Sequence, residues 1–376
     1  MKQLYKGGRL AIGGLIKTRD FVVKDGKFFS IEATIECDNC EVVQLDGLLV
    51  MPGLVDIHTH GVLGIDFNLF AKADFSRVIS FYHRFGVTSL FPTLVSDSFS
   101  HTINQISIIS ELKSLYPEIK GIHLEGPYIS KHFKGAISET YLKNPDISET
   151  KDFIKAAQGL HLHMTLSPEL DNACNFIKAF ASDNISFSLG HSGASYIQTK
   201  AAVEAGAKCF THAFNAMKAF NHHDPGIVGY MLESDSYLEL ISDGHHLSKD
   251  TIKLISTIKN PEKLILVTDS IMATGLENGE YYLGEAKITV KNNQAMLSGK
   301  KVRAGSTLTG FDAVNYYSRF TGVSMEEAWN LMSKNPAKML DMEKSFGRIA
   351  KGLDADFIIL DDWNIKSVFV QGKLRI

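Results

Sequence analysis

The sequence predicts an α/β fold whose main part is a (β/α)8 TIM-like barrel. Short apolar runs recur through the middle of the chain, and a helix-like segment follows each of them. This alternation is typical of βαβ units that build a parallel sheet, and about eight runs in roughly 250 residues match a closed barrel. An open doubly wound sheet is the alternative, but no glycine-rich nucleotide motif follows the first run. The runs span residues 48–57, 87–94, 119–124, 160–166, 185–189, 208–213, 237–241 and 264–267.

Both ends of the chain follow a different pattern, in which short β-like runs are separated by turns. Asp25-Gly26 is a favourable hairpin turn between two such runs. The C-terminal end shows the same pattern of short β-like runs separated by turns. Chain termini often lie close together in a folded domain. We therefore expect residues 1–51 and 345–376 to form one small β-sandwich domain, and residues 52–344 to form the catalytic barrel.

The composition excludes several classes of protein. The 376-residue chain carries a formal net charge of −3, which argues against a nucleic-acid-binding face. No apolar run approaches the roughly 20 residues that span a bilayer, and the N-terminus lacks the apolar core of a signal peptide, so we expect a cytoplasmic protein. The four cysteines fit reduced thiols in that compartment. Cys37-x-x-Cys40 has no second pair to complete a zinc site, so we expect ordinary loop or strand cysteines.

Histidines and carboxylates follow the apolar runs at places where turn residues would be usual. His58 and His60, spaced i, i+2, share one face of a strand. In a (β/α)8 barrel the C-terminal strand ends meet at the active site, so groups that follow different runs come together there. Imidazole and carboxylate suit zinc or iron, and a metal would satisfy their buried charge together. The other residues of this kind are His123, Glu125, His191, His212 and Asp269.

Longer motifs surround these residues. They are Met51-Pro-Gly-Leu-Val-Asp-Ile-His-Thr-His-Gly61, His123-Leu-Glu-Gly-Pro127, Lys134-Gly-Ala136, Leu189-Gly-His-Ser192, Thr211-His-Ala-Phe-Asn-Ala-Met217, Ser242-Asp-Gly-His-His246, Val267-Thr-Asp269, Ala304-Gly-Ser306 and Gly352-Leu-Asp-Ala-Asp-Phe357. Together they resemble the amidohydrolase superfamily and, within it, the N-acetylglucosamine-6-phosphate deacetylases and their N-acetylgalactosamine-6-phosphate relatives. The resemblance covers nearly the whole chain.

The resemblance implies a metal-dependent enzyme. It implies one divalent ion held by Glu125, His191 and His212. It also implies that His58 and His60 can hold a second ion, with Glu125 as the bridge between the two. Zinc, iron or cobalt would suit this set of ligands, and we expect one or two ions per subunit.

The implied reaction is hydrolysis of the acetamide of an N-acetylhexosamine 6-phosphate, in amino-sugar catabolism, by an enzyme that is a homodimer. We favour N-acetyl-D-glucosamine 6-phosphate as the substrate. Asp269 matches the residue that takes a proton from water and hands it to the leaving amine. The positions implied to contact the substrate are Ala136, Ile137, Asn215, Ala216, His223, Asp243, Gly244, His245, His246, Arg303, Ala304 and Gly305.

Three positions depart from the pattern of the deacetylases. Ile137 stands where these enzymes usually have a histidine that polarises the substrate carbonyl. His223 stands where they usually have an arginine that reaches the phosphate in a neighbouring subunit, and histidine lacks arginine's permanent charge and bidentate geometry. Arg303 replaces a usual leucine. We expect Arg303 to supply the anion contact that His223 does not, with an exposed or acid-paired arginine as the alternative.

Other interpretations stay open at this point. The sugar could be the galactosamine epimer or could carry no phosphate. A dihydroorotase-like or D-aminoacylase-like enzyme would usually have a carboxylated lysine after the fourth run, where this chain has Leu166-Ser-Pro-Glu169. A non-catalytic barrel would have lost some of its ligands, and here they are all present. His161 and His163 repeat the i, i+2 spacing, and we expect them to be structural.

Overall fold

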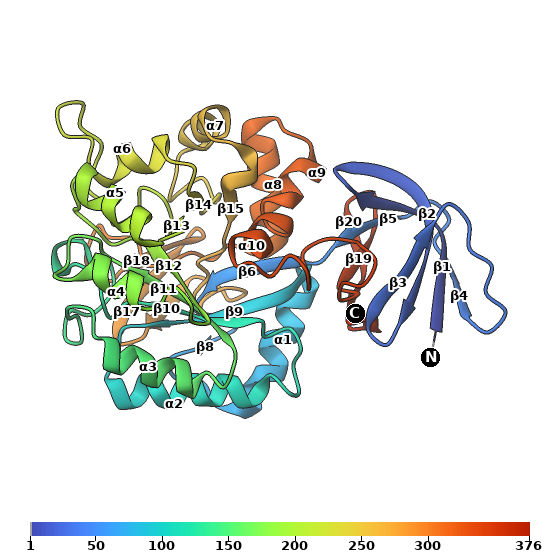
Figure 1. Cartoon of the computed structure of the whole chain (residues 1–376), viewed down its shortest axis with the longest axis horizontal. Coiled ribbons are helices and arrows are strands. Elements are labelled where there is room, and N and C mark those ends of the chain that lie inside the picture. The colour runs from blue at the N-terminus through green and yellow to red at the C-terminus, as the bar shows by residue number, and fades with distance from the viewer. Residues whose placement is uncertain (1) are drawn as a thin grey trace.

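Eight parallel strands form the barrel of the computed structural model, which describes residues 2–376 (Figure 1). The strands lie in chain order around the sheet, so the predicted (β/α)8 fold is confirmed. The first and last strands meet where the Asp269 amide donates to the His58 carbonyl (2.8 Å) and the His60 amide to the Ser270 carbonyl (2.7 Å). The strands are β6 (Leu54–Thr59), β9 (Val87–Val95), β10 (Gly121–Glu125), β11 (His161–Leu166), β12 (Ile185–Leu189), β13 (Cys209–Phe210), β14 (Tyr237–Leu240) and β15 (Leu264–Leu266).

Helices surround the barrel, and several begin at a residue whose side chain caps the first turn (Figure 1). Ser195 and Ser324 each form a full capping box with the residue three positions later, which satisfies two otherwise free amides. The helices are α1 (Phe75–Arg84), α2 (Phe99–Leu112), α3 (Ile147–Ala156), α4 (Ala173–Ala179), α5 (Tyr196–Ala205), α6 (Gly226–Glu233), α7 (Lys249–Ile258), α8 (Gly310–Thr321), α9 (Met325–Asn330) and α10 (Lys334–Met339), with 3-10 turns at Lys72–Asp74, Lys131–Phe133 and Pro261–Lys263.

Strands from both ends of the chain form one small sheet beside the barrel (Figure 1). Strand β1 pairs with β2 along its length, and its two halves pair with β4 and β5 respectively. The sheet curls around a core in which Tyr5 stacks on Phe21 at 4.6 Å, and Phe28 lies 5.8 Å from Phe357. Its strands are β1 (Lys2–Ile12), β2 (Leu15–Lys24), β3 (Lys27–Glu32), β4 (Glu41–Gln44), β5 (Leu49–Pro52), β19 (Phe357–Asp361), β20 (Asn364–Val370) and β21 (Lys373–Leu374).

The first apolar run, residues 48–57, is two strands rather than the single strand expected. Strand β5 belongs to the small sheet and β6 to the barrel, and the break between them is Gly53. The Gly53 amide donates to the Asp356 carbonyl (3.0 Å). A Cβ at position 53 would lie 1.9 Å from Oγ1 of Thr88, so only glycine lets the chain pass this close to β9.

A three-stranded sheet between β15 and α8 was not predicted. It consists of β16 (Gly279–Leu283), β17 (Ala286–Lys291) and β18 (Gln294–Leu297), and a short hairpin of β7 (Gly61–Val62) and β8 (Ile65–Asp66) lies near β6. Leu283 and Ile288 of this sheet share an apolar cluster with Val95, the last residue of β9, and with Ile137 in the loop after β10. The inserted sheet therefore covers the C-terminal ends of part of the barrel.

The expectation of four reduced cysteines is wrong for one pair. Cys37 and Cys40 are joined by a disulfide, because the loop before β4 brings their Cα atoms within 5.6 Å. Cys174 and Cys209 are free. Within residues 2–376, no helix has both the length and the apolar character that a bilayer crossing needs.

Candidate metal centre

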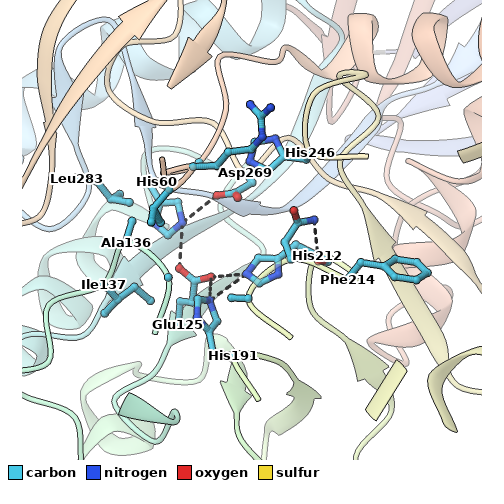
Figure 2. Close-up of a pocket in the computed structure, with 16 residues that line it drawn as sticks. His60, Glu125, Ala136, Ile137, His191, His212, Phe214, His246, Asp269 and Leu283 are labelled. Atoms are coloured by element: carbon cyan, nitrogen blue, oxygen red, sulfur yellow. Dashed lines mark hydrogen bonds and ion pairs between the residues drawn. The ribbon is translucent and has the colours of Figure 1, made fainter. Parts of the chain in front are cut away.

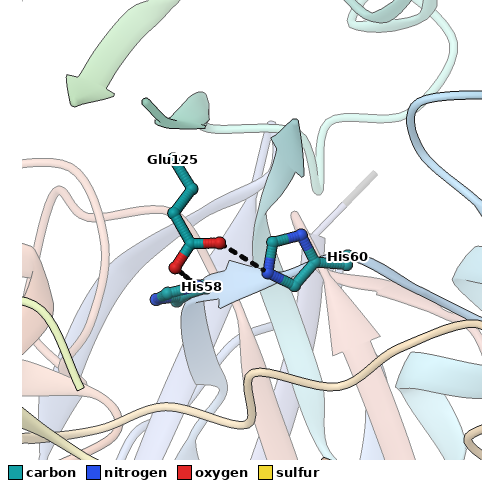
Figure 3. A group of neighbouring side chains, drawn as sticks. All are labelled: His58, His60 and Glu125. Atoms are coloured by element: carbon teal, nitrogen blue, oxygen red, sulfur yellow. Dashed lines mark ion pairs between the residues drawn. The ribbon is translucent and has the colours of Figure 1, made fainter. Parts of the chain in front are cut away.

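Six titratable side chains meet where the barrel strands end; Figure 2 shows five of them and Figure 3 shows His58. Glu125 closes β10, His58 lies on β6, and the others follow within three residues of the ends of β6, β12, β13 and β15. Each is at most 6% exposed. Several of these residues depart from ordinary strand geometry, since His191, His212 and Asp269 have positive φ angles of 48°, 29° and 49°. Strained backbone of this kind clusters at functional sites, where the surrounding structure holds it in place. The six are His58, His60, Glu125, His191, His212 and Asp269.

Glu125, His191 and His212 form the first of two potential metal sites. Oε1 of Glu125 lies 3.0 Å from Nε2 of His191 and 3.1 Å from Nε2 of His212. The two histidine nitrogens are 3.0 Å apart. Ligands bonded at about 2.0–2.1 Å to one cation lie at roughly such separations from one another. The three side chains can therefore hold one divalent ion without rearrangement.

His58, His60 and Glu125 form the second potential site (Figure 3). Nε2 of His58 lies 3.5 Å from Oε1 of Glu125, and Nε2 of His60 lies 3.3 Å from Oε2. Asp269 faces the same histidines, with its Oδ1 3.2 Å from Nε2 of His60 and 3.7 Å from Nε2 of His58. Since Glu125 offers an oxygen to each cluster, it is placed to bridge two ions.

The outer hydrogen bonds of His191 and His58 leave the inner nitrogens of these two histidines free for a cation. Nδ1 of His191 donates to the Phe133 carbonyl (3.0 Å), so Nε2 keeps its lone pair for the centre. Nδ1 of His58 lies 3.1 Å from Oε2 of Glu239. Nε2 of His58 is buried and has no hydrogen-bond partner among residues 2–376. A buried lone pair that faces carboxylates is unfavourable unless a cation lies between them, so this donor set fits a divalent metal.

The electrostatics of the centre are dominated by its two carboxylates. Burial alone would lower the pKa of His60, but its bonds to Asp269 and Glu125 raise it to about 9. Burial likewise opposes charge on His58, yet the same carboxylates raise its pKa well above the usual value. Burial would raise the pKa of Glu125, but His58, His191 and His212 hold it well below its usual range. The carboxylates are thus ionised and favour a positive partner.

A cavity of about 320 Å³ opens onto the centre (Figure 2). Seven of the twelve positions implied to contact substrate line it, and so do five of the six titratable side chains of the centre, all except His58. Phe214, Leu283 and Val302 also line it and were not predicted. The predicted residues on the wall are Ala136, Ile137, Asn215, Ala216, His246, Arg303 and Gly305.

The other five predicted positions lie outside this wall. His223 is exposed in the loop before α6, where its amide donates to the Asn221 side chain. Ala304 is buried beside the wall. Asp243 and His245 line a neighbouring cavity, and Gly244 lies between them in the chain. Asp243 holds His246 in place, because its Oδ2 lies 2.7 Å from Nδ1 of that histidine.

Arg303 and Ile137 occupy the cavity wall with different chemistry. The Arg303 guanidinium donates to Oε1 of Gln294 (3.3 Å) and is half-buried. No carboxylate within the described range 2–376 forms an ion pair with it. Ile137 is 4% exposed and packs in an apolar cluster that includes Leu283 and Ile129. The wall thus combines an apolar surface with one unpaired cation.

The sequence pattern of the amidohydrolase family matches residues 49–375. This range begins with β5 and contains the whole barrel, including both potential metal sites. The chain belongs to the amidohydrolase family.

Its similarity to individual members extends over almost the full length. A mouse N-acetylglucosamine-6-phosphate deacetylase is 34% identical over 388 residues, which cover 97% of this chain and 93% of the mouse protein. The crystal structure of such a deacetylase from Thermotoga maritima has 33% identity and a TM-score of 0.89, and covers 100% of this chain and 99% of its own. An aspartate-to-alanine variant of the Mycobacterium smegmatis deacetylase, in complex with N-acetyl-D-glucosamine-6-phosphate, has 28% identity, a TM-score of 0.92 and the same coverage.

Proposed function

We propose that this chain is a metal-dependent deacetylase that converts N-acetyl-D-glucosamine 6-phosphate to the amino sugar 6-phosphate and acetate, in amino-sugar catabolism. The observation that carries the proposal is the pair of metal sites joined by Glu125 and faced by Asp269 at the bottom of one cavity. The similarity to deacetylases over nearly the whole chain supports the choice of reaction and substrate.

Zinc, iron or cobalt would suit the ligand set of four imidazoles and one carboxylate. Glu125, His191 and His212 would hold one ion, and His58 and His60 would share Glu125 with a second. A bound divalent ion lowers the pKa of water from 15.7 towards about 7 and polarises the scissile carbonyl.

Asp269 is the residue that moves the proton in this proposal. Burial would raise its pKa, but His58 and His60 hold it below the usual value, so the carboxylate is ionised at neutral pH. It can accept the proton of the attacking water and then donate it to the leaving nitrogen, which could not leave as an amine anion. Position 137 carries isoleucine, which cannot donate a hydrogen bond to the substrate carbonyl. Polarisation of that carbonyl would therefore depend on the bound ion.

The substrate phosphate needs cationic partners on the cavity wall. His246 lines the wall and is oriented by Asp243. Arg303 lies on the same wall with a single neutral partner, Gln294, whereas His223 is exposed outside it. We assign the anion contact to Arg303, because its charge is permanent and otherwise unpaired.

A substrate panel on metal-reconstituted enzyme, with acetate release as the readout, tests the function. N-acetylglucosamine 6-phosphate should have the highest kcat/KM, followed by its galactosamine epimer and then free N-acetylglucosamine. Equal or better turnover of the free sugar would contradict the phosphate assignment, and no acetate from any N-acetyl sugar would contradict deacetylation. A homodimer and a cytoplasmic location stay predictions, which light scattering and cell fractionation would test.

A further inference from the structure

Glu239 is a fully buried carboxylate beneath the metal centre that the proposed reaction does not use. It lies on β14 and is 0% exposed. A buried charge is costly unless it has strong partners. The neighbours of Glu239 are histidines on other barrel strands, His58 on β6 and His163 on β11.

Its two oxygens have different neighbours. Oε2 lies 3.1 Å from Nδ1 of His58 and also accepts from the His212 backbone amide at 3.2 Å. Oε1 lies 3.5 Å from Nε2 of His163. One carboxylate oxygen thus contacts a ligand candidate from each potential metal site, and the other faces the interior of the barrel.

The second His-x-His pair lies below Glu239, with His163 at ion-pair distance from its Oε1 but without a hydrogen bond to it. Nδ1 of His163 lies 2.9 Å from the Ser186 hydroxyl, which is also 2.9 Å from Nε2 of His161. Nδ1 of His161 in turn lies 3.0 Å from the Asn184 side chain. A row of hydrogen-bonded groups therefore runs from the lower end of the barrel to His163, whose Nε2 faces Oε1 of Glu239 at 3.5 Å.

A third histidine packs against His58 without competing for the same contacts. The ring of His123 lies 4.4 Å from that of His58. Both of its nitrogens are occupied by hydroxyls, of Thr93 at 3.2 Å and Thr165 at 2.8 Å. Glu239 is consequently the only side chain among residues 2–376 that forms a hydrogen bond with Nδ1 of His58.

We propose that Glu239 is the positioning residue of the second metal site. Its carboxylate accepts a hydrogen bond from the Nδ1–H of His58, so that Nε2 keeps its lone pair for an ion shared with His60 and Glu125. A neutral histidine can carry its proton on either nitrogen, and the outer hydrogen bond decides which. This proposal depends on the proposed function in one respect, namely that a divalent ion binds at His58, His60 and Glu125.

Zinc binding to the stripped protein, measured by equilibrium dialysis without substrate, tests this role. The wild-type chain should bind two zinc ions, and the variant H58A/H60A should bind one. Glu239→Ala should bind one zinc ion at wild-type strength and lose the other. Glu239→Gln keeps an oxygen for the His58 proton but loses the charge, so its second site should be about 10–100-fold weaker. His163→Gln should weaken the same site less.

Glu118→Gln is the matched control, because Glu118 is another buried carboxylate that contacts a histidine, His83 at 3.1 Å, but no ligand candidate. It should bind two zinc ions at wild-type strength even if its unfolding temperature falls. Two tight sites in both Glu239 variants would overturn the proposal, as would a wild-type chain that binds one ion. Equal weakening of both sites would indicate a merely structural role. The number of bound zinc ions is measured without substrate, whereas the proposed reaction is tested by acetate release. Failure of one proposal can therefore be told apart from failure of the other.

Discussion

Backbone contacts place Asp269 at the centre as firmly as its side chain does. Its amide donates to the His58 carbonyl (2.8 Å), and its own carbonyl accepts from the Ser306 amide (2.7 Å). Its φ angle of 49° is unfavourable for a non-glycine residue. These contacts fix the carboxylate beside His60 before any substrate arrives, which is what a proton-transfer residue requires.

Asp269→Asn should abolish proton transfer while it keeps the size of the side chain. We expect kcat to fall by about 10²–10⁴-fold, with the ion at Glu125, His191 and His212 still bound. Steady-state acetate release and elemental analysis of the same sample measure both quantities. A loss of less than tenfold would mean that another group moves the proton.

Arg303 is the residue on which the substrate assignment depends most. Arg303→Leu should raise KM for N-acetylglucosamine 6-phosphate by about 10–100-fold, the effect of losing a charged hydrogen bond, and should leave free N-acetylglucosamine unaffected. Arg303→Lys should recover part of the loss, because it restores the charge. The exposed Arg319 on α8, changed to leucine, serves as the control. An unchanged KM for the phosphorylated sugar would mean that residues other than Arg303 bind the phosphate.

At the scale of elements, the strands and their terminal ligands were predictable from the sequence. Five of the eight apolar runs lead to a residue that strand geometry and barrel topology bring to one place, so Glu125, His191 and His212 were predicted together. Glu239 was missed, because one glutamate within the run Tyr237–Ile241 resembles an outward-facing strand residue. The sequence feature that could have identified Glu239 is its charge, because it lies in the middle of a strand that is buried on both faces.

Two other features depend on contacts that lie far apart in the sequence. The break between β5 and β6 comes from the proximity of Gly53 to Thr88, which no local pattern indicates. The inserted sheet of β16, β17 and β18 has recognisable strands, but nothing in its alternating pattern says that Leu283 faces the cavity. Local propensity predicts such elements, and tertiary packing decides where they lie.

Gly305, in the loop after the inserted sheet, packs closely against the segment that holds Asp269. Its φ angle is 61°, and a Cβ there would lie 2.5 Å from Cγ2 of Ile271 and 2.9 Å from the Asp269 carbonyl. Gly305→Ala should therefore displace Asp269 and lower kcat at least tenfold, in addition to about 1–2 kcal/mol of left-handed strain. Acetate release and thermal unfolding measure the two effects.

Gly299 provides the matched control for that substitution. Its φ angle is 75°, and no atom lies within 4 Å of a Cβ at this position. Gly299→Ala should carry the same backbone strain with wild-type kcat. If both alanine variants keep full activity, contact between Gly305 and the Asp269 segment does not matter for catalysis.

The barrel's apolar core crosses the boundary between barrel and small sheet. Met51 and Ile358 of the small sheet belong to the same core cluster as the barrel residues Leu54 and Val87. The Trp329 indole of α9 also donates to the Pro52 carbonyl (2.8 Å). The metal centre lies at one end of this interior, so the fold does not depend on an ion for most of its buried surface.

Removal of the metal should therefore weaken the folded chain without unfolding it. An ion that binds only the native state stabilises it by about 2.7 kcal/mol at a concentration one hundred times its Kd, and each occupied site contributes separately. Dialysis against a chelator should lower Tm by several degrees while far-ultraviolet circular dichroism stays native, and zinc should restore both Tm and acetate release. The H58A/H60A variant, with one site left, should show a smaller change in Tm on chelation. Collapse of the circular dichroism signal on chelation would contradict a metal-independent core, and an unchanged Tm would mean that no ion had been bound.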